Sequence, residues 1–163
     1  MKFVVDGMLG KLARWLRMLG QDVVYSTSLV DSELEETAKN EKRALLTRDF
    51  ELYRHAVSRD IDAFYVDGQT EAERLAQIAR RFGVPLTPNM SLSRCPKCNS
   101  KIQPVSKEKI SLKVMLNTLN SHDAYWECPN CGKVYWEGAH WTKIRETLEE
   151  AKRKLKSQNE KER

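Results

Sequence analysis

The sequence predicts an α/β protein with a parallel sheet flanked by helices, followed by a small cysteine-bearing module and a terminal helix. Three observations support this prediction. Short apolar strands alternate with amphipathic helices through the first half of the chain. All four cysteines follow, as two CxxC pairs. The net charge also changes, because residues 1–90 carry 13 Lys/Arg and 14 Asp/Glu whereas residues 91–163 carry 15 and 9. We therefore expect an α/β domain at 1–90, a ribbon module at 91–141, and a C-terminal helix with a disordered tail at 142–163.

The α/β domain is predicted from apolar runs that alternate with helical periodicity. Each short apolar run is a candidate strand, and the segments between the runs repeat leucine or alanine at helical spacing. The expected strands are 3–5, 23–25, 44–47 and 63–66, and the expected helices are 8–19, 31–42, 49–57 and 70–82. Strands that alternate with helices form parallel sheets that are covered on both faces.

Acidic residues follow the strands of this predicted sheet. Asp6 follows the first strand, Asp49 closes the third and Asp67 follows the fourth. Asp31 begins the helix between the second and third strands. Ligand sites of such sheets lie beyond the carboxyl ends of the strands, so these carboxylates are expected to converge. Clustered carboxylates repel one another unless a cation neutralises them, and hard oxygen ligands suit Mg²⁺ or Mn²⁺. Taken singly, each aspartate can equally be a helix N-cap or a turn residue, and Asp67-Gly68 is a common turn pair.

Cys95, Cys98, Cys128 and Cys131 are predicted to bind one structural zinc ion. Each pair forms a CPxC turn, and two such turns supply the four thiolates of a tetrahedral site. The pairs are separated by 29 residues, so an insertion at about 111–122 is expected to lengthen the loop between them.

Two disulfides or a redox-active pair are the alternatives to zinc. Disulfides require an oxidising compartment, and a thioredoxin-type pair would be a single CxxC on a βαβ unit. Because tetrahedral zinc is already satisfied by four cysteines, His140 is expected to pack or to form hydrogen bonds.

The sequence offers no motif for other chemistry. It contains no glycine-rich phosphate loop, dinucleotide fingerprint or nucleophile elbow. No apolar run has the length needed to cross a bilayer, and the first residues do not have the pattern of a secretory signal. We therefore expect a cytoplasmic protein that does not contact membranes.

The acidic residues lie within motifs that resemble a known family. Asp6 with the following MLGKLARWLR (8–17), then Asp31, then LTRDFEL (46–52) resemble the PIN-like ribonuclease fold. More narrowly, they are similar to the RNase domain found at the C-terminus of the Mut-seven exonucleases and as stand-alone prokaryotic proteins.

The cysteine pairs extend this resemblance. In that family a zinc ribbon follows the PIN-like part, and SRCPKCN (93–99) and CGKVYWEGAHW (131–141) resemble its two ribbon motifs. The resemblance covers residues 1 to about 148, and the combination of motifs is more specific than any one of them.

The resemblance implies a metal-dependent ribonuclease that hydrolyses phosphodiester bonds of RNA, with single-stranded RNA as the expected partner. It implies that Asp6, Asp31 and Asp49 bind catalytic Mg²⁺ or Mn²⁺. Glu51 stands at the place of a fourth acid, two residues after the Thr-x-Asp motif, and Asp67 is the other candidate for that role. The alternative function is a non-catalytic RNA-binding or RNA-processing factor on a PIN-like scaffold. In either case zinc removal is expected to unfold residues 95–141 before it alters the acidic site.

Basic residues are candidates for RNA contacts. Lys11, Arg14 and Arg17 form a stripe opposite the apolar face of the first helix, and Arg48 adjoins Asp49. A phosphate backbone binds such charge, whereas a solvent-facing amphipathic helix accounts for the stripe equally well. The aromatic residues of the ribbon are expected mainly to form its core, with base stacking as the alternative.

The last segment is predicted to begin as a helix. Ile144, Leu148, Ala151 and Leu155 repeat at helical spacing, which predicts a helix packed on the body of the protein. From Lys156 the composition becomes wholly polar, and disorder is expected there.

Overall fold

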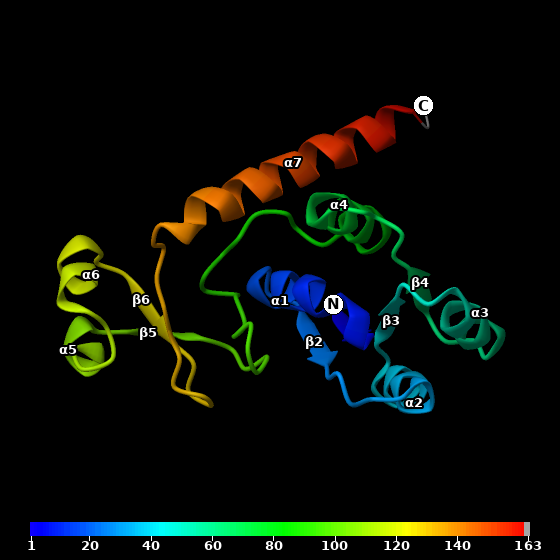
Figure 1. Cartoon of the computed structure of the whole chain (residues 1–163), viewed down its shortest axis with the longest axis horizontal. Coiled ribbons are helices and arrows are strands. Elements are labelled where there is room, and N and C mark those ends of the chain that lie inside the picture. The colour runs from blue at the N-terminus through cyan, green and yellow to red at the C-terminus, as the bar shows by residue number, and fades with distance from the viewer. Residues whose placement is uncertain (162–163) are drawn as a thin grey trace.

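The computed structural model describes residues 1–161 (Figure 1). Its first half is built on a four-stranded parallel sheet in the order β2-β1-β3-β4. The strands are β1 (Lys2–Val5), β2 (Asp22–Tyr25), β3 (Ala44–Thr47) and β4 (Ala63–Tyr65). The two central strands are almost wholly buried, as expected for strands with helices on both faces. The α/β prediction is confirmed.

Helices cover both faces of this sheet because successive side chains of a strand point to opposite sides. Phe3 and Val5 pack against one group of helices, and Val4 between them packs against the other. The first group is α1 (Gly10–Met18, preceded by the 3₁₀ turn Gly7–Leu9), α4 (Glu71–Phe82) and α7 (His140–Lys161). The second group is α2 (Asp31–Glu41) and α3 (Phe50–Ser58).

The terminal helix is longer than the sequence predicts. In Figure 1 α7 crosses above α4, and it joins the core through Leu148 and Ala151, both buried. The expected disorder from Lys156 is wrong as far as Lys161, which is still helical. Leu155 packs against the core, and Lys154 forms ion pairs with Glu73 of α4 and Glu150 of α7. The expected disorder at 162–163 lies outside the described residues.

The cysteines lie in turns next to a second, antiparallel sheet in the order β5-β6-β7. Its strands are β5 (Gln103–Val105), β6 (Tyr125–Glu127) and β7 (Val134–Tyr135). The insertion between β5 and β6 begins earlier than the predicted 111–122, because it holds two short helices, α5 (Lys107–Ile110) and α6 (Leu116–Ser121). Ring packing supports the expectation that the ribbon aromatics form its core. Tyr125 and Trp141 are buried, and Trp126, Tyr135 and Trp136 pack against the ribbon's two small apolar clusters.

Two further points concern the whole chain. Within residues 1–161, no helix is both long and apolar enough to cross a membrane. The division at residues 90 and 141 stays a prediction, although the last helix begins at His140 and returns to the α/β domain.

Candidate functional site

Asp6 and Asp49 are connected through the buried hydroxyl of Thr47. Asp6 follows β1, and its backbone N–H extends the ladder to Leu46 of β3 at 3.0 Å. The Thr47 hydroxyl donates to Asp6 Oδ2 at 2.8 Å and accepts from the Asp49 backbone N–H at 2.9 Å. Thr47 is fully buried, so its hydroxyl cannot exchange these two partners for water and keeps donating to Asp6 and accepting from Asp49. It holds the two acids at the carboxyl ends of neighbouring strands.

Asp49 is the N-cap of α3, as the alternative interpretation predicts. Its Oδ1 accepts from the backbone N–H groups of Glu51 and Leu52 at 2.9 and 3.1 Å. Within residues 1–161, Oδ2 of Asp49 and Oδ1 of Asp6 accept no hydrogen bond. Capping therefore fixes the Asp49 carboxylate and leaves one of its oxygens available for a ligand.

Asp31 lies within electrostatic reach of both acids. It is the first residue of α2. Val30 is the N-cap of this helix, and the Glu33 carboxylate accepts a hydrogen bond from the Val30 backbone N–H at 2.9 Å. Asp31 therefore does not cap its helix. Desolvation, and then the charges of Asp49 and Asp6, raise the pKa of its carboxyl. The structure thus brings the three predicted acids to one edge of the sheet.

The cysteines form a tighter group of potential metal ligands. Among the described residues, they are the one group of three or more His, Cys, Asp or Glu residues placed to hold a metal ion, and their ligand atoms all lie within 4.8 Å of one another. Asp6, Asp31 and Asp49 do not form such a group within residues 1–161.

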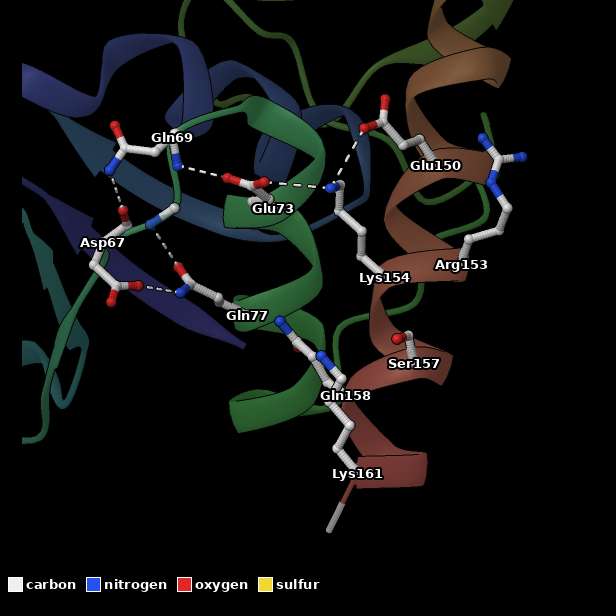
Figure 2. Close-up of a pocket in the computed structure, with 11 residues that line it drawn as sticks. Asp67, Gln69, Glu73, Gln77, Glu150, Arg153, Lys154, Ser157, Gln158 and Lys161 are labelled. Carbon is white, nitrogen blue, oxygen red and sulfur yellow. Dashed lines mark hydrogen bonds and ion pairs between the residues drawn. The ribbon is translucent and has the colours of Figure 1, made fainter.

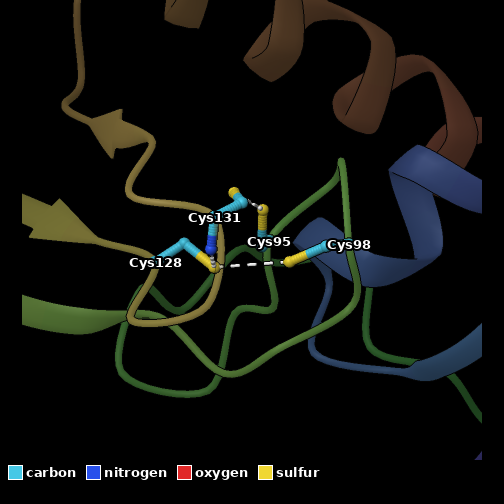
Figure 3. Close-up of side chains that lie close together, drawn as sticks. All are labelled: Cys95, Cys98, Cys128 and Cys131. Carbon is cyan, nitrogen blue, oxygen red and sulfur yellow. Dashed lines mark hydrogen bonds between the residues drawn. The ribbon is translucent and has the colours of Figure 1, made fainter.

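The four cysteine sulfurs have the spacing of a tetrahedral metal site (Figure 3). The Sγ atoms of Cys95 and Cys131 are 3.6 Å apart and those of Cys98 and Cys128 are 3.4 Å apart, too far for a disulfide. All four thiols are free. Zinc–sulfur bonds of about 2.3 Å place tetrahedral sulfurs about 3.8 Å apart. The cluster can therefore hold one zinc ion.

The surroundings of the cluster favour a thiolate at Cys98, whereas burial raises the pKa of the Cys128 thiol. The backbone N–H of Ser100, followed by the side chain of Asn130, holds the pKa of the Cys98 thiol at about 5. The Tyr135 hydroxyl lies 3.0 Å from Cys95 Sγ. His140 is exposed at the start of α7 and lies outside the cluster, and its exposure does not support the expectation that it packs.

Comparison with known proteins identifies the family. The sequence model of the Mut7-C RNAse domain matches residues 1–148. The chain belongs to the Mut7-C RNase domain family. No curated protein and no solved structure matches it significantly. Membership confirms the predicted resemblance and indicates ribonuclease activity with RNA as the substrate.

One predicted RNA contact of this Mut7-C chain is wrong. Arg17 is only 6% exposed, whereas Lys11 and Arg14 on the same helix are exposed. Its Nε and Nη2 donate to the Val23 carbonyl at 3.1 and 2.8 Å, and its Nη1 donates to the Pro96 carbonyl at 2.9 Å. Arg17 therefore joins the α/β domain to the first cysteine turn and does not face solvent.

Asn99, at the end of the first cysteine turn, adds further hydrogen bonds to this junction between the turn and β2. The sequence did not reveal the junction. The side-chain oxygen of Asn99 accepts from the Val23 N–H at 3.0 Å, and its nitrogen donates to Asp22 at 2.8 Å. Asn99 has a φ of 71°, a left-handed conformation that asparagine tolerates better than most residues. Because β2 is an edge strand, the first cysteine turn covers hydrogen-bonding groups that would otherwise be exposed.

The candidates for a fourth acid differ in position. Glu51 is exposed on α3, and its carboxylate lies 3.8 Å from Arg54. Asp67 accepts a hydrogen bond from the side chain of Gln77 on α4 and lines a pocket of about 590 Å³ between α4 and α7 (Figure 2). Its carboxylate is thus directed toward α4.

Arg48 lies between Thr47 and Asp49 in the sequence and is half-buried. Within residues 1–161 it has no hydrogen bond or ion pair. Its guanidinium is therefore available to an anion at this edge of the sheet.

Proposed function

We propose that this Mut7-C domain is a metal-dependent ribonuclease that hydrolyses RNA at the edge formed by Asp6, Asp31 and Asp49. The observation that carries the proposal is the Thr47 hydroxyl, which fixes two of these acids on neighbouring strands. Desolvation, and then the charges of Asp49 and Asp6, raise the pKa of Asp31, so the third acid adds to the electrostatic cost of the arrangement. A cation would remove that cost.

The donor set suits Mg²⁺ or Mn²⁺. Carboxylate oxygens are hard ligands, and Mg²⁺ keeps several of its water ligands when it binds proteins. Three carboxylates at one edge of the sheet, two of them with a free oxygen, supply ligands of this kind. In this proposal Asp6 and Asp49 each present one free oxygen to the metal, and Asp31 ligates or orients a water molecule.

The residues around the acids have separate tasks in the reaction. A bound divalent ion lowers the pKa of water and stabilises the leaving oxygen of a phosphodiester. Thr47 maintains the geometry of Asp6 and Asp49 without contacting substrate. Arg48, with Lys11 and Arg14 on α1, binds the phosphate backbone of RNA. Glu51 is close enough in sequence to assist, and it stays a candidate.

The cysteines bind structural zinc in this proposal. The ribbon then presents a basic module beside the α/β domain, and RNA binding should weaken with salt because phosphate contacts release counterions.

Purified protein incubated with labelled single-stranded RNA, with and without Mn²⁺, tests the proposal. Asp6→Asn and Asp49→Asn keep the hydrogen-bond acceptors, and asparagine caps helices as well as aspartate, so both variants should fold and lose cleavage. Asp67→Asn is the matched control, because that acid faces α4, and it should cleave normally. Equal cleavage by wild type and both site variants would mean contamination and would refute the assignment. Tight, salt-sensitive binding of RNA without cleavage would favour the non-catalytic alternative.

A further inference from the structure

Three aromatic rings form a cluster beside the proposed acidic site. Phe50 and Tyr53 lie on α3, and Tyr65 is the last residue of β4. The ring centroid of Phe50 is 5.5 Å from that of Tyr65 and 6.0 Å from that of Tyr53, and the two tyrosines are 6.1 Å apart. None of the three belongs to either apolar core of the α/β domain. The three rings therefore contact one another outside these cores, between α3 and the end of β4.

Strand register places the cluster next to the acids. Val5 pairs with Leu46, so Asp6 follows in line with Thr47, and Thr47 pairs with Tyr65. Partners in register point to the same face of a sheet. Asp6, Thr47 and Tyr65 thus form a row across the carboxyl edge on the face that α2 and α3 cover. Two strand spacings, about 10 Å, separate the ends of this row.

The cluster is open to solvent at Phe50. This side chain is 53% exposed, and it is the first residue of α3, directly after Asp49. Two other exposed apolar residues are close to the other acids in the sequence, Met8 after Asp6 and Val30 before Asp31. An exposed aromatic ring directly after a site acid is placed to contact a ligand that is partly apolar.

We propose that Phe50, Tyr53 and Tyr65 form a stacking platform for an unpaired nucleobase of the RNA substrate; this rests on the proposed function. Aromatic rings bind bases through their faces, and every base offers such a face. Arg48 and the acid-bound metal would hold the adjoining phosphate. A base in a duplex is already stacked and cannot lie on the platform, so the cluster selects single-stranded RNA.

Binding of a single-stranded oligoribonucleotide to the full chain tests this inference. An Asp49→Asn background prevents cleavage, and fluorescence anisotropy gives Kd. We expect Phe50→Ala to raise Kd roughly 5- to 100-fold, the range of losses for a stacked base. Phe50→Trp should restore binding, whereas Phe50→Leu, which keeps apolar volume without a ring, should not. Val57→Ala is the control, because Val57 is 48% exposed on the same helix but lies in its last turn.

A second readout separates stacking from other contacts. A 2-aminopurine base in the bound RNA should lose fluorescence on wild type and regain it on the Phe50→Ala variant. Equal Kd values for Phe50→Ala and Val57→Ala, or a wild-type Kd for Phe50→Leu, would overturn the platform while leaving the ribonuclease proposal intact. Failure of the wild-type chain to bind or cleave any RNA would instead overturn both.

Discussion

Replacing Arg17 with methionine removes the guanidinium that joins the first cysteine turn to the sheet, while an unbranched side chain remains in its place. The buried guanidinium donates to three backbone carbonyls, those of Val23, Pro96 and Lys97. Two of these carbonyls lie about 80 positions away in the sequence, in the ribbon. The substitution therefore tests whether the two modules stabilise one another.

The size of the effect follows from these contacts. A hydrogen bond to a charged group contributes roughly 1.5–3 kcal/mol, so three acceptors suggest at least about 5 kcal/mol. Desolvation of the guanidinium opposes this, as the lowered pKa of Arg17 indicates, and costs several kcal/mol. We expect Arg17→Met to lower the free energy of unfolding by about 2–4 kcal/mol. For a chain of this length that corresponds to a fall in Tm of about 5–15 °C.

Urea unfolding of the zinc-loaded chain, followed by tryptophan fluorescence, measures this loss. Arg14→Met is the matched control, because Arg14 lies on the same helix and is exposed, and surface changes alter stability by about 0.5 kcal/mol or less. Arg17→Lys should be intermediate, since an ammonium cannot reach all three carbonyls with one planar group. If Arg17→Met and Arg14→Met unfold at the same urea concentration, the junction contributes no stability and the reasoning is wrong.

Three further predictions concern the junction and the acidic edge. Although desolvation acts to raise the pKa of Asp22, the hydrogen bonds from Arg43 and Asn99 lower it overall. The ionised Asp22 carboxylate therefore stabilises the folded protein above the pKa that Asp22 has in the unfolded chain, and this stability is lost as pH falls through its lower folded pKa. Below pH about 4, the urea midpoint should therefore fall more steeply for wild type than for Asp22→Asn. Thr47→Val should reduce cleavage roughly 10- to 100-fold by releasing Asp6 and Asp49, and Thr47→Ser should recover most of the activity; unchanged cleavage by the valine variant would contradict a positioning role. Chelation of zinc should increase amide hydrogen exchange in β2 as well as in the ribbon, and exchange confined to 95–141 would contradict coupling through the junction.

The features that local sequence determines were predictable. Apolar alternation located the strands, and parallel topology then placed Asp6 and Asp49 at a common edge, because all carboxyl ends of such a sheet lie on one side. The spacing of the two CxxC pairs likewise predicted a four-sulfur cluster. These inferences needed no knowledge of contacts between distant residues.

Contacts between distant residues account for what the sequence did not predict. Helical periodicity placed Arg17 on the polar side of α1, but it does not show that this side meets a cysteine turn. The polar composition after Lys156 suggested disorder, whereas Leu155 and the ion pairs of Lys154 hold this part of α7 against α4. The sequence did not show that Phe50 contacts Tyr65, because this contact depends on how α3 packs against β4.

The position of the junction links the ribbon to the acids more directly than separate modules would suggest. Val23 of β2 is held by Arg17 and Asn99. Two residues further along the same strand, the Tyr25 hydroxyl donates to the Gly7 carbonyl at 3.1 Å, in the turn that directly follows Asp6. The Tyr25 hydroxyl also occupies the space of a side chain at position 10, because a Cβ on Gly10 would lie 2.3 Å from the hydroxyl oxygen. Glycine at the start of α1 therefore makes room for Tyr25. A loosened cysteine turn would free β2 at one end and the Asp6 turn at the other, over a strand only about 13 Å long. A zinc ion held by the cysteines would thus affect how well the acidic edge is formed without contacting the acids.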